Sequence, residues 1–267
     1  MSVIVQFNPA GRMGNRMFQY GVGYILATKG NKELYHDGLP NFGIPPHHGE
    51  IVAVPPIIDI HKKWGENDAD IDLLIDHPGS IIINSFLQKS SHFKDYRDIL
   101  RGAFNITPHD TINKESLVVH VRETDYTQID CFLGYDFYKS MIDNSGFTDI
   151  KIVTDNSDCD TVKKLVSDGC SVVTEGYVDK FQFHCNNRSI SDFNTLLRSE
   201  NIALSQSSFS WWAAFLGNHQ KIIFPFSTTV NMWPVDPGRD DIDLYFDFNG
   251  ESTKYCLLYT SPSPRDS

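Results

Sequence analysis

The sequence predicts an α/β protein with two lobes, in which helices cover parallel sheets. In the second half of the chain, short apolar runs alternate with segments of helical periodicity, which is the pattern of strand–helix–strand units. The length of 267 residues is ample for two compact domains of the usual size. Hydrophobic residues make up 40% of the chain, so it can bury a sizeable core, and global disorder is excluded.

The first half of the chain shows fewer regular elements. A helix is expected from residue 12 because Met13, Met17 and Tyr20 recur at helical spacing after an apolar, strand-like start. Residues 36–60 are rich in Pro, Gly and His, and they are expected to be irregular. The elements expected here are strands at 3–7 and 80–84 and helices at 12–29 and 93–104.

The second half begins after the polar, Pro-containing stretch 107–110, which is the best candidate for a domain boundary. We therefore expect an N-terminal lobe over 1–110 and a C-terminal lobe over 111–247. The polar Ser/Pro ending predicts a tail over 248–267 that is disordered or an artefact of sequence assembly. The elements expected are strands at 117–121, 149–153, 171–174, 202–205 and 221–224, and helices at 136–145, 159–167, 190–200 and 211–217.

Composition excludes several function classes. The formal net charge of −11 argues against a general nucleic-acid binder, although an anionic ligand needs only a local positive pocket. No run approaches 18 consecutive apolar residues, and the N-terminus lacks the features of a signal peptide, so we expect a cytoplasmic protein with no membrane span. Five cysteines without a C-x-x-C pair indicate reduced thiols rather than a disulfide scaffold or a structural zinc site.

Residues 11–15, Gly-Arg-Met-Gly-Asn, form the first candidate binding loop. The loop lies between a predicted strand and a predicted helix, where backbone N–H groups point toward an anion and glycines allow close approach. It is neither a G-x-G-x-x-G fingerprint nor a Walker loop. A simple tight turn explains this loop about as well.

His120 and Arg122 form the second candidate. They lie two residues apart at the end of a predicted strand, so they share one face at the edge where open α/β sheets bind ligands. An arginine there can hold a pyrophosphate through two hydrogen bonds. Taken alone, a core histidine and a surface Arg–Asp pair would explain the motif better.

The third candidate is the polar turn Ser205-Gln-Ser-Ser-Phe-Ser210, which leads from a strand into a helix. Serine hydroxyls and the amides of the first helical turn can bind phosphate. The alternative is helix capping, with Trp211 and Trp212 as packing residues.

Together, these motifs resemble those of the family 11 glycosyltransferases, the α-1,2-fucosyltransferases. Residues 11–20, GRMGNRMFQY, resemble the family's opening motif GRLGNQMFQY, and residues 120–126, HVRETDY, resemble its HxRRGDY. Residues 192–216 resemble the third block, in which a helix and a strand lead into SSFSWW. The similarity spans about residues 3–234.

The resemblance implies a GT-B-like fold of two Rossmann-type lobes that face a cleft. It implies inverting transfer of L-fucose from GDP-β-L-fucose to a sugar hydroxyl, typically galactose O2, with no metal and no cofactor. The partners would be a GDP-sugar donor and a galactose-containing glycan acceptor. The N-terminal lobe would hold the acceptor, and peripheral contact with a membrane surface is compatible with this function.

Several residues acquire roles from this resemblance. Arg122 matches the arginine that holds the donor β-phosphate, and Asp155 is a candidate guanine or ribose contact. Asp125 is the candidate general base, with loop hydrogen bonding as its alternative role and Glu123 as runner-up. Further substrate-binding matches are Gly11, Arg12, Gly14, Asn15, His120, Ser207, Ser208, Phe209 and Ser210.

Glu123 is the main departure from the family pattern, because it stands where the motif has a second arginine. A carboxylate beside a diphosphate would repel it, but strand alternation can turn Glu123 away from the face of Arg122. The departure keeps open a catalytically inactive nucleotide-sugar or glycan-binding homologue; a different transferase and a chain that does not fold are further alternatives. A metal-dependent reading would need a D-x-D motif, and the four such pairs are expected by chance among 34 acidic residues.

Overall fold

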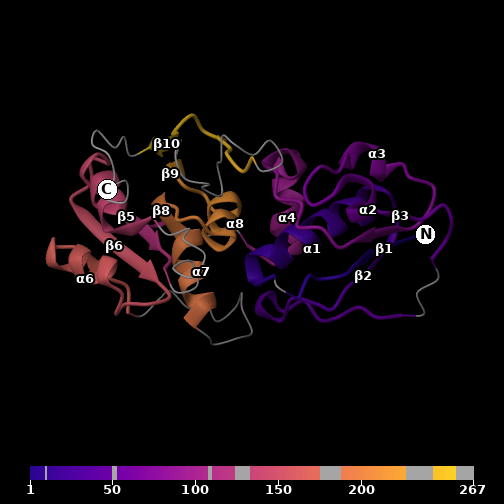
Figure 1. Ribbon diagram of the computed structural model, residues 1–267, viewed down its shortest axis with the longest axis horizontal. Helices are drawn as coiled ribbons and strands as arrows, with labels where there is room; N and C mark the ends of the chain where they lie inside the picture. Colours follow the sequence, from indigo (N-terminus) through magenta and orange to yellow (C-terminus); the bar gives the residue numbers. More distant parts are fainter. Residues whose placement is uncertain are drawn as a thin grey trace, which may run out of the picture.

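The computed structural model describes residues 1–9, 11–49, 53–107, 110–123, 133–174, 188–226 and 243–256. These residues form two lobes, each with its own sheet (Figure 1). Every strand pair within the two sheets is parallel, so the predicted α/β class is confirmed. The first sheet uses strands before residue 110 and the second uses strands after it.

The N-terminal sheet has the strand order β2-β1-β4-β3. Its central strands are apolar and mostly buried, as expected for a parallel sheet covered by helices. The strands are β1 (Ser2–Val5), β2 (Glu33–Tyr35), β3 (Ile58–Asp59) and β4 (Ile81–Ile83). The helices of this lobe are α1 (Met13–Lys29), α2 (Ile60–Trp64), α3 (Ile71–Ile75) and α4 (Arg97–Ala103), with 3-10 turns η1 (Pro40–Phe42), η2 (Ser90–His92) and η3 (Lys94–Tyr96).

The C-terminal sheet has the order β10-β9-β8-β5-β6-β7. From β5 the chain proceeds outward through β6 and β7, and then returns to build β8, β9 and β10 on the other side. The strands are β5 (Ile112–Val121), β6 (Asp149–Thr154), β7 (Ser171–Val172), β8 (Ser199–Ala203), β9 (Lys221–Phe226) and β10 (Ser252–Cys256). The helices are α5 (Gly134–Asp143), α6 (Asp160–Ser167), α7 (Arg188–Arg198) and α8 (Ser208–Leu216).

Several expectations need correction. The predicted tail begins too early, because 252–256 pair in parallel with β9, and this edge strand depends on that pairing more than on its own polar sequence. Residues 257–267 lie outside the described part of the chain. The stretch 36–60 ends in β3, and the helix expected over 93–104 is α-helical only in α4. The short elements β2, α2 and α3 were not predicted.

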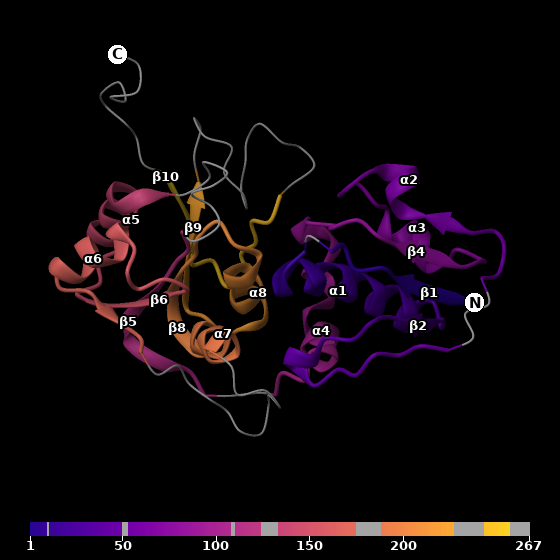
Figure 2. The ribbon, with the colours of Figure 1, turned by 60° about the horizontal axis from the view of Figure 1, so that its bottom comes forward.

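Helix α8 joins the two lobes into one core. It belongs to the C-terminal lobe by sequence, but it packs against α1 and α4 of the N-terminal lobe (Figure 2). The ring of Phe18 lies 4.8 Å from the ring of Trp211 and 5.0 Å from that of Trp212, and all three side chains are fully buried. One hydrophobic cluster therefore runs from β1 through α8, and the boundary at residue 110 does not separate independent cores.

Two arginines of α4 cap the carboxyl end of α8. Arg97 donates from Nε to the Phe215 carbonyl at 2.7 Å and from Nη2 to the Gly217 carbonyl. Arg101 donates to the Leu216 carbonyl at 2.8 Å and to the same Gly217 carbonyl at 3.0 Å. These bonds satisfy carbonyls that a helix end leaves without partners, and they place positive charge at the negative end of the helix dipole.

We expect Arg97→Ala to lower the free energy of unfolding by about 1–3 kcal/mol, because buried carbonyls lose a charged donor. Burial already lowers the pKa of Arg97 to about 10, so the guanidinium stays protonated at neutral pH. Urea unfolding would measure the change. The matched control is Lys94→Ala, which removes an exposed cation from the neighbouring turn and should change stability little. Equal stability of the two variants would contradict this role for Arg97.

Candidate functional site

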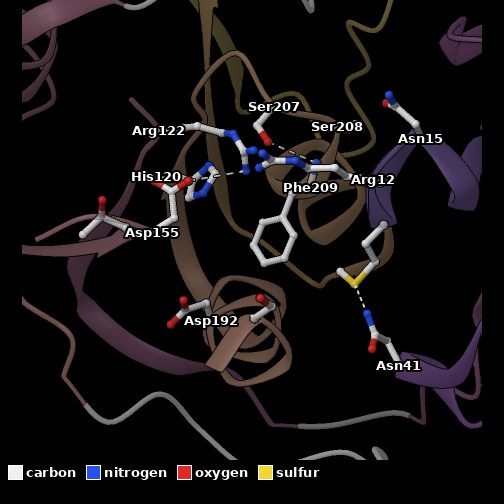
Figure 3. Close-up of a pocket in the computed structure, with 14 residues that line it drawn as sticks. Arg12, Asn15, Asn41, His120, Arg122, Asp155, Asp192, Ser207, Ser208 and Phe209 are labelled. Atoms are coloured by element: carbon white, nitrogen blue, oxygen red, sulfur yellow. Dashed lines mark hydrogen bonds and ion pairs between the residues drawn. The ribbon is translucent and has the colours of Figure 1, made fainter. Parts of the chain in front are cut away.

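A pocket of about 410 Å³ lies between the lobes (Figure 3). The C-terminal sheet reverses its winding between β5 and β8, and ligands of open α/β sheets bind at such a switch point, outside the carboxyl ends of the strands. The pocket occupies this place. Its lining comes from α1, η1, the ends of β5 and β6, and the first turns of α7 and α8: Arg12, Met13, Gly14, Asn15, Asn41, His120, Arg122, Thr154, Asp155, Ser189, Asp192, Ser207, Ser208 and Phe209.

The first turns of α1 and α8 meet at the pocket wall. A Cβ atom on Gly14 would lie 2.5 Å from Ser208 Oγ, so only glycine permits this approach. Trp212 secures the contact by donating from Nε1 to the Gly14 carbonyl at 3.0 Å. Ser207 caps α8 and accepts from the Phe209 N–H at 3.3 Å. Two helix N-termini thus present N–H groups and positive dipole ends to one region, which favours an anion.

Arg122 and Asp155 face each other across the ends of β5 and β6. Arg122 Nη1 lies 3.8 Å from Asp155 Oδ2, and the arginine side chain is only 13% exposed. Arg12 lines the pocket on the opposite side, from the N-terminus of α1 (Figure 3). The helix termini and both arginines therefore place positive groups in the pocket of a protein of strongly negative net charge, and the carboxylates of Asp155 and Asp192 line the same pocket.

His120 is buried deep at the pocket wall. Ser205 Oγ lies 2.6 Å from its Nδ1, and the Phe209 ring stacks on it at 5.5 Å. Burial, with a smaller contribution from Arg122, lowers the pKa of His120 to about 3. The imidazole is consequently neutral at physiological pH, and it can offer one ring nitrogen to a ligand while Ser205 holds the other.

Asp192 on α7 lines the pocket but was not predicted as a site residue. Burial raises its pKa to about 6; the nearby Arg188 lowers it and Asp155 raises it further. Arg188 Nε lies 3.7 Å from Asp192 Oδ2. The sequence did offer a signal for Asp192. It is an acidic residue on the inner face of an amphipathic helix, and it is the first residue of the third motif block.

Asn41, Thr154 and Ser189 also line the pocket without having been predicted, as does Met13, which lies in the candidate loop 11–15 but was not itself named as a binding residue. Asn41 reaches the pocket from η1 and donates from Nδ2 to Met13 Sδ at 3.1 Å. These contacts join segments that are distant in sequence, so local patterns carry no signal for them.

Two predicted binding residues lie outside the pocket lining. Gly11 forms the preceding turn, where its N–H donates to the Asn8 carbonyl at 2.9 Å. Ser210 is buried on α8, and its hydroxyl turns back to the Ser207 carbonyl at 3.2 Å. Both residues support the binding turns and do not face the pocket. The candidate base Asp125 lies outside the described residues.

Glu123 turns away from the pocket. Its side chain is 7% exposed and lies near Cys159, at the start of α6. Glu123 is absent from the pocket lining, as strand alternation allows. It is therefore placed neither to repel a bound anion directly nor to serve as the runner-up base.

Among the described residues, no group of three or more His, Cys, Asp or Glu side chains is arranged to hold a metal ion. Within the same ranges, no helix has the length and apolar character needed to cross a membrane.

The fold and the pocket define an α/β protein of GT-B-like arrangement, in which a pocket lined by two arginines and two helix N-termini lies between two parallel-sheet lobes. No protein-family model matches the sequence. No curated protein matches it either.

Solved structures similar to this chain include two fucosyltransferases. The chain is 11% identical to fucosyltransferase NodZ from Bradyrhizobium, with a TM-score of 0.42 over 80% of this chain and 92% of that one. It is 10% identical to POFUT1 in complex with GDP-fucose, with a TM-score of 0.45 over 84% of this chain and 97% of that one.

Proposed function

We propose that this protein is an inverting glycosyltransferase that moves L-fucose from GDP-β-L-fucose to a sugar hydroxyl. The observation that carries the proposal is the convergence of Arg122, Arg12 and the N-termini of α1 and α8 on one pocket between the lobes. The residues that converge there belong to the motifs that resemble those of family 11 glycosyltransferases. That resemblance supports galactose O2 as the acceptor and an α-1,2 linkage.

The positive groups of the pocket suit the departing GDP. As the bond from fucose C1 to the β-phosphate oxygen breaks, negative charge grows on the diphosphate and positive charge on the sugar ring. The forked guanidinium of Arg122 and the first turn of α8 line this pocket, and they would stabilise that anion. We propose that these groups suffice without a metal or cofactor, and that the acceptor hydroxyl attacks from the opposite face of the sugar.

The nucleoside end of the pocket suits guanine. Guanine offers two adjacent donors, N1–H and the 2-amino group, and a carboxylate accepts from both. Two carboxylates line the pocket, and Asp155 lies against Arg122, so we assign Asp155 to positioning the guanidinium. We assign guanine recognition to Asp192, with Phe209 and neutral His120 beside the base.

Asp192→Asn tests this assignment. The amide keeps the shape but offers only one acceptor, so GDP binding should weaken by about tenfold or more. The apo variant should be more stable than the unsubstituted protein at pH 8, because burial penalises the charged acid and raises its pKa.

The pH dependence gives a further test of Asp192. Because the folded-state pKa is raised, folding favours the protonated acid, and apo stability should rise as the pH falls through about 6. GDP binding should weaken over the same range, since it needs the carboxylate. Calorimetry with GDP from pH 5 to 8 would show this step, and Asp192→Asn should lack it. A step of equal size in both proteins would contradict the assignment.

The acceptor is proposed to approach from the N-terminal lobe. Glu123 no longer favours an inactive homologue, because its side chain lies away from the pocket. The test is a transfer assay with GDP-fucose and a terminal galactoside, followed by NMR of the product. An α-linked fucose on galactose O2 is the expected product. Tight GDP binding without transfer to any glycan would identify a binding protein instead.

A further inference from the structure

Asn15, in the first turn of α1, is held from behind by a buried glutamine. Asn15 lines the pocket, and its Oδ1 accepts from Gln88 Nε2 at 3.1 Å. Gln88 is 8% exposed and lies between β4 and η2. Its backbone N–H donates in turn to Oδ1 of the buried Asn67 at 2.8 Å. The chain of hydrogen bonds from Asn67 through Gln88 thus ends at the pocket wall.

The backbone beside Gln88 has an unusual conformation. Leu87 has φ of 60°, and the other described non-glycine residues with positive φ are asparagines, which tolerate this region. The Leu87 side chain is fully buried, and its N–H donates to the Glu66 carbonyl at 3.0 Å. The surroundings therefore impose a conformation that a branched side chain disfavours, and this conformation sets where Gln88 lies.

The hydrogen bond from Gln88 determines which end of the Asn15 amide is available. A primary amide has one oxygen and one NH₂ group. Because Oδ1 is turned toward Gln88, Nδ2 is left as the donor for a ligand. In Figure 3, Arg12 and Ser208 lie between Asn15 and Arg122, while Asp192 and Asn41 lie beyond Phe209. A donor at this place is complementary to diphosphate oxygens.

We infer that Gln88 is a positioning residue that fixes the Asn15 amide with Nδ2 toward the diphosphate of the nucleotide. This inference rests on the proposed function, since it takes a GDP-type ligand as the occupant. Gln88 itself does not line the pocket, and it acts only through Asn15. Its role is to hold the Asn15 amide in one of its two orientations, the one in which the NH₂ group can donate to an anion.

Gln88→Glu tests the inference. A carboxylate at this position can only accept, so it draws Nδ2 of Asn15 toward itself and turns Oδ1 to the ligand. We expect GDP affinity to fall by about tenfold or more, while guanosine, which has no phosphate, binds within about twofold of the unsubstituted protein. Gln220→Glu is the matched control, because it adds the same charge at an exposed site and should leave both affinities unchanged.

Gln88→Met separates amide orientation from charge. Methionine fills similar space, carries no charge and donates nothing, so the Asn15 amide loses its fixed orientation. We expect GDP affinity to fall several-fold, with guanosine again unaffected and the apo melting temperature near that of the unsubstituted protein. If Gln88→Glu does not fold, Gln88→Met still tests the inference by itself.

The outcomes are distinguishable by calorimetry with GDP and guanosine. A selective loss of GDP affinity in the Gln88 variants supports the inference. Unchanged GDP affinity in Gln88→Met, or equal losses for GDP and guanosine, would overturn it and leave Gln88 a merely structural residue. Failure of the unsubstituted, folded protein to bind GDP would overturn both the inference and the proposed function.

Discussion

Arg122→Ala is expected to abolish fucosyl transfer and to weaken GDP binding by about a hundredfold or more, since removing one member of a desolvated charge contact costs about 2–5 kcal/mol. Arg122 is largely buried at the end of β5, and it lies 3.8 Å from Asp155. Without the guanidinium, the Asp155 carboxylate would remain beside the diphosphate and repel it. The departing GDP would also lose its main stabilising charge.

Calorimetry with GDP and a transfer assay with GDP-fucose would measure the two effects of Arg122→Ala. Arg122→Lys keeps the charge but not the fork, so it should recover part of the binding and little of the turnover. Lys163→Ala is the matched control, because it removes an exposed cation from the same lobe, outside the pocket lining. Turnover near that of the unsubstituted protein in Arg122→Ala would contradict the role proposed for this arginine.

Gly14→Ala is expected to disrupt the contact between the N-termini of α1 and α8. The added Cβ would lie 2.5 Å from Ser208 Oγ and 2.7 Å from the Ser208 carbonyl carbon, so α1 and α8 must separate. Overpacking of this kind costs about 1–3 kcal/mol. Because both helix N-termini form the proposed phosphate site, GDP binding should be lost even where the variant folds.

The control is Gly102→Ala on α4. A Cβ at Gly102 meets no atom within 4 Å, and alanine in a helix interior is favoured by about 0.5–1 kcal/mol over glycine. Gly102→Ala should therefore be neutral or stabilising and should bind GDP normally. Melting temperatures and GDP affinities of both variants provide the comparison. Normal GDP affinity in Gly14→Ala would contradict the proposed role of the α1–α8 contact.

The sequence predicts the parts of this fold that depend on local pattern. The apolar run ending at His120 and Arg122 forms β5, and strand alternation correctly places both side chains at one pocket while Glu123 turns away. The motif around Ser207 forms the capped start of α8, so the capping alternative also holds. In these cases the sequence pattern that predicts the structure spans only a few residues, which is the range over which strand alternation and helix capping act.

Features that depend on tertiary contacts were not predictable. Asp192 becomes part of the pocket because α7 packs beside the ends of β5 and β6, and its raised pKa arises from that burial. Gln88 reaches Asn15 across 73 positions of sequence. Strand β10 exists through its pairing with β9, since its own sequence is polar. Such features depend on contacts between segments that are distant in sequence. The hydrophobic periodicity of a single segment does not specify these contacts.

The pocket is proposed to bind a guanosine diphosphate sugar, and thermal unfolding with nucleotides in EDTA tests this binding most directly. A ligand at ~100 times its Kd stabilises the folded protein by about 2.7 kcal/mol. For a chain of this size, that corresponds to a rise in Tm of several degrees. We predict this rise with GDP and GDP-fucose, and no rise with UDP-galactose. A cooperatively unfolding protein that gains nothing from GDP or GDP-fucose, or gains as much from UDP-galactose, would contradict the account.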